Sequence, residues 1–201
     1  SNDRNDLEQR VEDMDEVTFR RTLQELTQQA GRFLEATSLA RDRAYQSMLE
    51  QSLRVFTRRV GELLEAERAS LFLVDRERQE LVLRVAQDMP EGDYVRIPLA
   101  SGIAGAAAMS GEVVRVDDAY ADPRFNQAVD AETGFRTRSM LCLPLQDRSG
   151  AVFAVTQLLN RRDGRPFDEH DTRRYAEFAS SLSVLLESLV KVGGTTARRA
   201  P

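Results

Sequence analysis

The sequence predicts an α+β protein in which terminal helices flank a single sheet. Three observations support this: the apolar period is helical up to about Arg68, extended from Ala69 to Leu159, and helical again from Asp168. A change from spacings of three and four residues to strict alternation marks a change from helix to strand. The 201 residues leave room for one domain of ordinary size and additional helices.

The N-terminal segment is expected to be helical with little interruption. One apolar stripe runs over residues 7–33 and a second over residues 45–63, and Gly31 or Thr37-Ser38 marks a kink or a turn. So narrow a stripe must be covered by another helix, because soluble proteins rarely expose such a surface. That helix belongs either to the same chain or to a second copy. We favour the second copy, and so expect a homodimer through the terminal helices.

The middle of the chain is expected to contain six strands, a small helix and a long polar connection. A helix of small residues over 100–111 ends at Gly111. The connection over 117–137 has a short helix near 124–128 and exceeds about 12–15 residues, a length at which loops are usually functional or disordered. Its aromatic residues favour a lid over a pocket. The strands are expected at residues 70–75, 80–86, 94–98, 113–116, 139–145 and 151–159.

A last helix is expected from Asp168, with an apolar face from Tyr175 to Leu189, and it should stop at Gly193-Gly194. We therefore divide the chain into a helical dimerisation segment over residues 1–52, a domain over 53–192 and a disordered tail over 193–201.

Composition excludes several classes of function. A net charge of −5 disfavours a general nucleic-acid binder, which must neutralise phosphates. No apolar run is long enough to span a membrane, and no secretory leader opens the chain. We therefore expect a cytoplasmic protein that does not associate with a membrane. A single cysteine, Cys142, excludes an intrachain disulfide and a cysteine-cluster metal site, and we interpret it as an inert core thiol. His170 lies in a charged helix start. We expect no catalytic centre, no metal and no cofactor.

The lid and the strand after it carry a recognisable pattern. The stretch Asp117-Asp118-Ala119-Tyr120-Ala121-Asp122-Pro123-Arg124-Phe125-Asn126 is followed by Thr133-Gly134-Phe135-Arg136-Thr137-Arg138-Ser139 and Leu141-Cys142-Leu143-Pro144-Leu145. With Asn160 after the next strand, this order resembles the GAF domains of cyclic-nucleotide phosphodiesterases and bacterial adenylyl cyclases over roughly Leu53 to Leu189. The resemblance implies the GAF fold: a six-stranded antiparallel sheet, flanking N- and C-terminal helices, and a ligand lid.

Members that bind cyclic nucleotides carry a signature of Asn-Lys, a gap, Phe, three residues and Asp-Glu. The corresponding residues are Asn160-Arg161, Phe167 and Asp171-Thr172. Arginine keeps the charge of lysine, so we expect Arg161 to pair with Asp171, while Thr172 departs from the pattern. The signature is typical of a structural brace more than of a ligand contact.

The resemblance also implies ligand contacts in the small helix and the lid. Ile103 and Ala104 correspond to phosphate-contacting positions at a helix start, where backbone N–H groups attract anions. Asp130, Thr133 and Thr137 correspond to lid positions that contact the ligand. From the residues alone, tight packing and turn formation are equally open roles.

Four further positions are carried over from the sheet. Ser70 and Gln157 correspond to residues that face the base, although alternation alone leaves Gln157 free to face solvent. Ala86 and Gln87 stand where the family places an aromatic residue against the purine, and a lid phenylalanine is the available substitute.

Two functions are compatible with these residues. The first is a noncatalytic sensory module that binds a small ligand, cAMP or cGMP, and couples it to the arrangement of the dimer helices. The alternative is a GAF scaffold that dimerises and transmits signals without a nucleotide.

Overall fold

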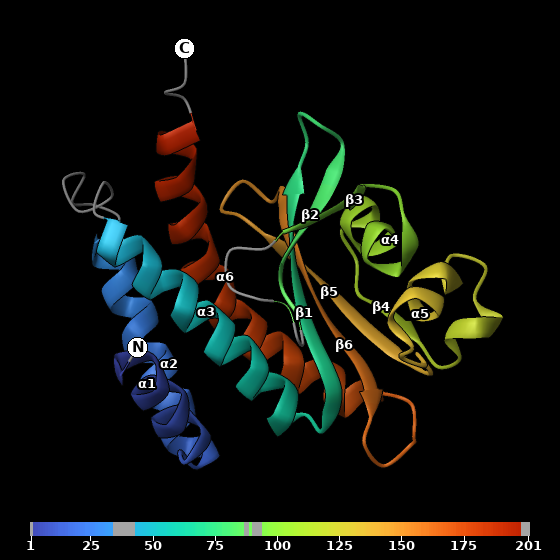
Figure 1. The fold of residues 1–201 in the computed structure, drawn as a ribbon, viewed down its shortest axis with the longest axis horizontal. Coiled ribbons are helices and arrows are strands. Elements are labelled where there is room, and N and C mark those ends of the chain that lie inside the picture. Colours follow the sequence, from blue (N-terminus) through green and yellow to red (C-terminus); the bar gives the residue numbers. More distant parts are fainter. Residues whose placement is uncertain (1, 34–42, 87–88, 90–93, 198–201) are drawn as a thin grey trace. The chain divides into compact units, whose positions relative to one another are not determined.

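The computed structural model describes residues 2–33, 43–86, 89 and 94–197. The chain divides into two compact units, one formed by Ser1–Arg59 with Ser180–Pro201 and the other by Val60–Ala179 (Figure 1). The turn expected at Thr37-Ser38 and the site residue Gln87 lie outside the described residues.

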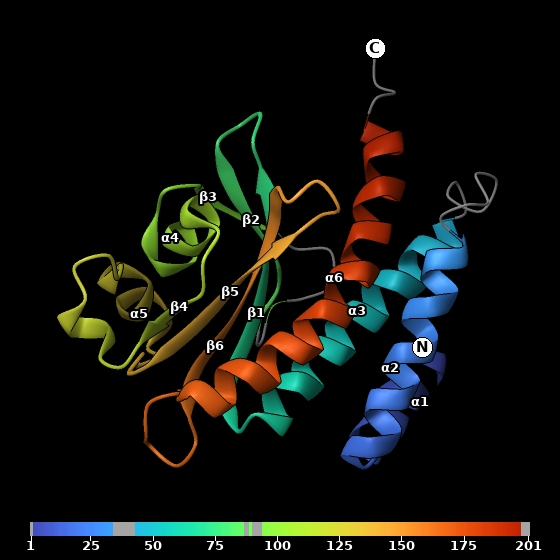
Figure 2. The same ribbon diagram turned by 180° about the vertical axis from the view of Figure 1, so that it is seen from behind.

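The unit of Val60–Ala179 is built on one six-stranded sheet in which every pair of neighbours is antiparallel. Helices α4 (Gly102–Ser110) and α5 (Gln127–Thr133) lie on one face, and the beginning of α6 (Glu169–Ala197) lies on the other (Figure 2). The expected α+β arrangement and sheet are confirmed. The strands, in spatial order, are β3 (Val95–Pro98), β2 (Glu80–Val85), β1 (Ala66–Asp75), β6 (Val152–Arg161), β5 (Met140–Gln146) and β4 (Val114–Val116).

Both faces of the central strands are buried. Ser70 and Gln157 are Cα partners across β1 and β6 and face the side of α4 and the lid. Thr156, the residue before Gln157 on β6, faces the other side, where its hydroxyl hydrogen-bonds the hydroxyl of Tyr175 on α6. Gly61, at the end of α3 (Arg43–Leu63), packs so closely on β1 that an added Cβ would lie 2.8 Å from that of Ala69.

The N-terminal helix is interrupted between Glu12 and Glu16, a break that the apolar spacing did not predict. Helix α1 (Asn2–Glu12) ends before α2 (Glu16–Phe33) begins. Asp15 caps α2: its carboxylate accepts from the N–H of Thr18 at 2.7 Å, and its carbonyl accepts from Phe19 at 2.9 Å. From the sequence alone, Asp15 could be a polar residue on the exposed side of one helix or the cap that begins a new helix. The structure shows that it is the cap.

Two boundaries near the site also differ from the prediction. Helix α3 ends at Leu63, and β1 already begins at Ala66 after a left-handed Glu65 with φ of 55°. The lid helix begins three residues later than expected, at Gln127, because the Asn126 side chain accepts from the N–H of Ala128 at 3.1 Å. It ends at Gly134, whose φ of 70° forms the cap.

Helix α6 continues to Ala197, so the stop expected at Gly193-Gly194 was wrong. Glycine lowers helix stability by about 1 kcal/mol relative to alanine but keeps its backbone N–H, so two glycines do not interrupt the hydrogen-bond pattern. The predicted tail therefore begins inside this helix, and its last residues, 198–201, lie outside the described part of the chain.

In the unit of Ser1–Arg59 and Ser180–Pro201, part of the N-terminal stripe is covered within the same chain. Val11, Phe19 and Leu23 are buried, and the rings of Phe19 and Phe56 lie 5.5 Å apart. The intrachain interpretation, which we had ranked second, therefore describes these residues. No helix in the described residues is both long and apolar enough to cross a bilayer.

Candidate functional site

A cavity of about 600 Å³ lies between the sheet, the start of α4 and the lid. Its walls come from β1, β2, β3, β5, β6, α4 and the connection that contains α5. Eight of the nine ligand positions implied by the resemblance line it, and the ninth, Gln87, lies outside the described residues. The eight are Ser70, Ala86, Ile103, Ala104, Asp130, Thr133, Thr137 and Gln157.

The start of α4 presents backbone N–H groups to this cavity. Ser101 occupies the cap position with φ of −84° and ψ of 134°, and its side chain makes no capping hydrogen bond within the described structure. The carbonyl of Ser101 accepts from Gly105 at 3.1 Å, which leaves the N–H groups of Ile103 and Ala104 in the first turn, ahead of the first intrahelical bond. Gly105 is required because an added Cβ would lie 2.6 Å from the carbonyl oxygen of Leu99.

Asp130 is the centre of a polar network within the lid. Its carboxylate accepts from the backbone N–H of Thr137 at 2.7 Å, from the Thr137 hydroxyl at 2.8 Å and from the Tyr120 hydroxyl at 2.8 Å. The hydrogen bond to Asp130 raises the pKa of Tyr120. Both Asp130 and Thr137 are buried. Most hydrogen-bond acceptor positions of the Asp130 carboxylate are therefore occupied by other residues of the lid.

Thr133 behaves differently from its lid neighbours. Its side chain is exposed, and its hydroxyl donates to the Val129 carbonyl one turn earlier at 2.9 Å. The same oxygen accepts from the N–H of Phe135 at 3.4 Å. These contacts give Thr133 the turn-forming role that was left open, while the residue still lines the cavity.

The floor of the cavity is formed by Ser70 and Gln157, which are both more than nine-tenths buried. The Gln157 carboxamide oxygen accepts from the Cys142 thiol at 3.4 Å. Among the described residues, neither the Gln157 amide nitrogen nor the Ser70 hydroxyl has a hydrogen-bond partner. The floor therefore keeps free polar groups that face into the cavity.

Aromatic surface reaches the cavity from the lid. Ala86 lines the wall where the resemblance placed an aromatic residue, and Phe125 and Phe135 line it from the opposite side. The guanidinium carbon of Arg68 lies 3.9 Å from the centroid of the Phe135 ring, a cation–π contact between β1 and the lid. Arg136 makes a similar contact with Tyr120 at 3.5 Å.

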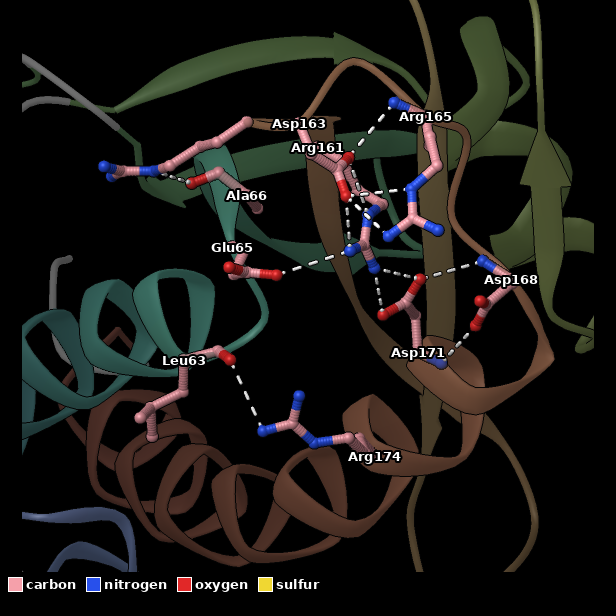
Figure 3. A network of polar contacts seen from close by, with 10 residues as sticks. Leu63, Glu65, Ala66, Arg161, Asp163, Arg165, Asp168, Asp171 and Arg174 are labelled. Carbon is pink, nitrogen blue, oxygen red and sulfur yellow. Dashed lines mark hydrogen bonds and ion pairs between the residues drawn. The ribbon is translucent and has the colours of Figure 1, made fainter.

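The signature residues Asn160, Arg161, Phe167 and Asp171 define a brace at the end of β6. Figure 3 shows its central pair, Arg161 and Asp171. Arg161 donates to both carboxylate oxygens of Asp171, at 2.6 and 2.7 Å, and to those of Asp163, at 3.1 and 2.8 Å. The hydrogen bonds from Arg161 hold the pKa of Asp163 well below its usual range. Phe167 is fully buried.

Asp171 also fixes the start of α6. Its carboxylate accepts from the N–H of Asp168 at 2.9 Å, and the Asp168 carboxylate accepts from the N–H of Asp171 at the same distance. Thr172, the departure from the family signature, donates its hydroxyl to the Asp168 carbonyl at 2.9 Å. None of these residues lines the cavity, so the brace supports the fold and not the ligand wall.

Asn160 connects the brace to the end of the lid. It adopts a left-handed conformation with φ of 54°. Its carboxamide oxygen accepts from Arg138 at 2.6 Å and Ser139 at 3.1 Å, and its nitrogen donates to Glu67 at 3.0 Å and to the Arg136 carbonyl at 2.9 Å. The carboxamide thus has a partner for each of its four hydrogen-bonding positions.

Sequence reasoning missed three contributors to the site: Arg68, Tyr120 and Cys142. Alternation along β1 places Arg68 two residues before Ser70 and so on the same face, which was a usable signal. The contacts of Tyr120 and Cys142 join residues 10 and 15 positions apart through the tertiary fold, and no local pattern predicts them.

Comparison with known proteins places these features in a family. Residues 48–186 match the GAF domain family. The chain is 38% identical over 144 residues to the dual 3′,5′-cyclic-AMP and -GMP phosphodiesterase 11 of Drosophila melanogaster, over 64% of this chain and 10% of that protein. It is 37% identical over 129 residues to the probable 3′,5′-cyclic phosphodiesterase pde-5 of Caenorhabditis elegans, over 58% of this chain and 17% of that protein. The chain thus spans less than a fifth of these relatives.

Solved structures share the fold at lower identity. The GAF domain of a phosphoenolpyruvate-protein phosphotransferase from Coxiella burnetii matches with a TM-score of 0.63 and 20% identity, over 88% of this chain and 98% of that chain. The free methionine-R-sulfoxide reductase of Neisseria meningitidis matches with a TM-score of 0.60 and 23% identity, over 89% and 94%. The family match covers more than half of the sequence, and the sheet, lid and brace agree with it: this chain belongs to the GAF domain family.

Proposed function

We propose that the cavity binds a cyclic nucleotide, cAMP or cGMP, and that the domain acts as a noncatalytic regulatory module. The observation that carries the proposal is convergence: a helix start, two open polar residues on the sheet and a closed lid all border one cavity of about 600 Å³. Such a volume lies within the range of small-molecule sites, about 300–1,000 Å³. The similarity to two phosphodiesterases named for cyclic nucleotides supports this ligand class.

The phosphate would lie at the start of α4. The N–H groups of Ile103 and Ala104 are in the first turn, where the helix dipole favours an anion. Gly105 supports this placement, because a larger residue would push α4 away from the chain segment before it. The small side chains of this turn allow a charged group to approach the backbone closely.

The base would lie over the floor. Ser70 and Gln157 offer a hydroxyl and an amide side by side, and a purine edge carries donors and acceptors at a similar spacing. Phe125 and Phe135 supply the aromatic surface that Ala86 lacks. Stacking of a base on an aromatic ring contributes about 1–3 kcal/mol, so a lid phenylalanine offsets the alanine on the sheet.

The polar groups of the cavity suit binding better than catalysis. They are hydroxyls, two amides, the guanidinium of Arg68 and one carboxylate, Asp130, which already accepts three hydrogen bonds. Burial raises the pKa of Cys142, so its thiol is a poor nucleophile. His170 is exposed on α6 and does not line the cavity.

A scaffold that binds no nucleotide is the second candidate. It is favoured by the lid, whose polar residues Asp130, Thr133 and Thr137 are already paired with protein groups. On this alternative, the lid is closed permanently and the domain transmits a signal through its helices alone.

The proposed homodimer through the terminal helices now needs a different surface, since the N-terminal stripe is partly covered within one chain. Val17 on α2 remains 76% exposed and offers a sharp test. Sedimentation equilibrium should show a dimer for the wild type and a monomer for Val17→Glu. A monomeric wild type would contradict the dimer.

Isothermal titration calorimetry with cAMP, cGMP and the matching 5′-monophosphates tests the ligand. We expect saturable binding of at least one cyclic nucleotide and weaker binding of the open-chain monophosphates. Asp163→Asn, which lies in the brace region away from the cavity, serves as the control and should keep the affinity. A wild-type protein that binds neither cyclic nucleotide would favour the scaffold.

A further inference from the structure

Gln157 has a defined orientation on the floor of the cavity, and we propose that Cys142 sets it. The buried thiol holds the carboxamide oxygen toward β5, so that the amide nitrogen faces the cavity as a hydrogen-bond donor. This inference rests on the proposed function, because it assigns to the cavity a ligand that presents an acceptor to Gln157. Cys142 is then a positioning residue that acts through Gln157 and does not touch the ligand.

The two side chains are held together by the sheet. Cys142 on β5 and Gln157 on β6 are Cα partners, and the Cys142 sulfur lies 3.4 Å from the Gln157 carboxamide oxygen. Cys142 is fully buried and does not line the cavity. A thiol is a weak donor and a weak acceptor, and here it donates to the accepting end of an amide that also has a donating end. The thiol therefore selects which end of the carboxamide turns toward β5.

The Cys142 thiol must be protonated to donate a hydrogen bond to the Gln157 oxygen. Burial raises the pKa of the Cys142 thiol far above neutrality, so the sulfur keeps its hydrogen. A thiolate would instead accept from the amide nitrogen and would turn the carboxamide round. Because the thiol stays protonated, its hydrogen remains available to the Gln157 oxygen on the side of β5.

The amide nitrogen of Gln157 is available to a ligand. Gln157 is more than nine-tenths buried, and no described residue accepts a hydrogen bond from its amide nitrogen. Such a group is unfavourable unless something in the cavity satisfies it. Ser70, directly opposite on β1, adds a hydroxyl that can donate or accept. A planar ring with an acceptor beside a donor satisfies both residues.

The orientation can be tested without a ligand. In a two-dimensional NMR spectrum of the full chain, the side-chain amide signals of Gln157 are those that disappear in Gln157→Leu. We expect Cys142→Ala to shift or broaden them and Cys142→Ser, which keeps a donor, to restore a single sharp pair. Val114→Ala, at the cross-strand partner of Cys142 on β4, removes buried volume without touching Gln157 and should leave them in place. Unchanged signals in Cys142→Ala would overturn the proposal.

A double-mutant cycle with cGMP and cAMP tests the effect on binding. In the wild-type background, Cys142→Ala should weaken the affinity by about 2- to 10-fold, the range of one hydrogen bond. In the Gln157→Leu background the same change should have no effect, and Cys142→Ser should recover the wild-type affinity. Equal losses in both backgrounds would mean that Cys142 acts by packing alone, which overturns the proposal. A wild type that binds neither nucleotide overturns the proposed function, and the amide signals then decide the role of Cys142.

Discussion

The lid and the floor of the cavity differ in whether their polar side chains have hydrogen-bond partners within the protein. In the lid, Asp130, Thr137 and Tyr120 satisfy one another through three hydrogen bonds of 2.7 to 2.8 Å. On the floor, Ser70 and the amide nitrogen of Gln157 have no partner among the described residues. The resemblance assigned ligand contacts to both regions. Of the two, it is the floor that has polar groups available to hydrogen-bond a ligand.

This difference separates stability from binding. Removing a partner from a satisfied buried network leaves other groups unpaired and destabilises the fold. Removing an unpaired group that borders the cavity leaves no protein partner unsatisfied and harms only the complex with a ligand. Changes in the lid should therefore lower the free energy of unfolding, and changes on the floor should lower affinity.

The largest expected effect is that of Asp130→Ala. It strands the Tyr120 hydroxyl and both Thr137 donors, so the free energy of unfolding should fall by about 3 kcal/mol, measured by urea denaturation. Glu132→Ala, an exposed change on the same helix, should stay within about 0.5 kcal/mol of the wild type. A loss for Asp130→Ala no larger than that of the control would show that the lid network contributes nothing.

On the floor, Gln157→Leu should lower cyclic-nucleotide affinity about tenfold while changing the free energy of unfolding by less than about 1 kcal/mol. Thr156→Val is the matched contrast, because Thr156 is the next residue on β6 and faces the other side of the sheet, where it bonds Tyr175. It should lose about 1 kcal/mol of stability and keep the affinity. Calorimetry and urea denaturation of both variants test the separation, and a reversed pattern would refute it.

The two lid threonines should differ although both line the cavity. Thr137→Ala removes a buried hydroxyl bonded to Asp130 and should lower the free energy of unfolding by about 1 kcal/mol. Thr133→Ala changes an exposed helical residue and should stay within about 0.5 kcal/mol. Thermal unfolding of the two single variants measures this. Equal losses would mean that burial does not distinguish them.

The smallest effect concerns high pH. The hydrogen bond to Asp130 raises the pKa of Tyr120 above its ordinary value of 10.0. A raised pKa in the folded state means that its contribution to stability is complete below pH 10.0 and is lost as the pH rises through the folded-state pKa. Unfolding of the wild type should therefore become easier as the pH rises above 10.0, and Tyr120→Phe should reduce that dependence. Parallel profiles would show that the bond does not link the lid to pH.

Local signals were sufficient to predict much of the fold and the location of the cavity. Gly111 ends α4 with a positive φ, which a sequence can indicate because few other residues adopt it, whereas the end of the lid helix at Gly134 was not predicted. Alternation along β6 left the direction of Gln157 open, and the resemblance assigned both Ser70 and Gln157 to the ligand side of the sheet. The resemblance added the lid and α4 positions, which line the same cavity.

The remaining features depend on contacts between distant residues. Nothing local distinguishes Asp130 as a ligand contact from Asp130 as the acceptor for Tyr120, or Thr133 from Thr137 in burial. The apolar stripe around Phe19 requires a partner helix, but periodicity does not say whether that helix belongs to the same chain, as it does for Phe56. Helix α6 passes Gly193-Gly194 because its hydrogen bonds continue where propensity alone predicts an end.

Asn160 has a consequence for which sequences this fold can tolerate. The position requires a left-handed backbone and, at once, two acceptor sites and two donor hydrogens on a short side chain. Glycine meets the backbone requirement without the contacts, aspartate keeps the acceptors and loses the donors, and glutamine is one methylene too long. In a saturation-mutagenesis library selected for folding, position 160 should therefore retain a single amino acid, whereas the nearby exposed position 162 accepts many.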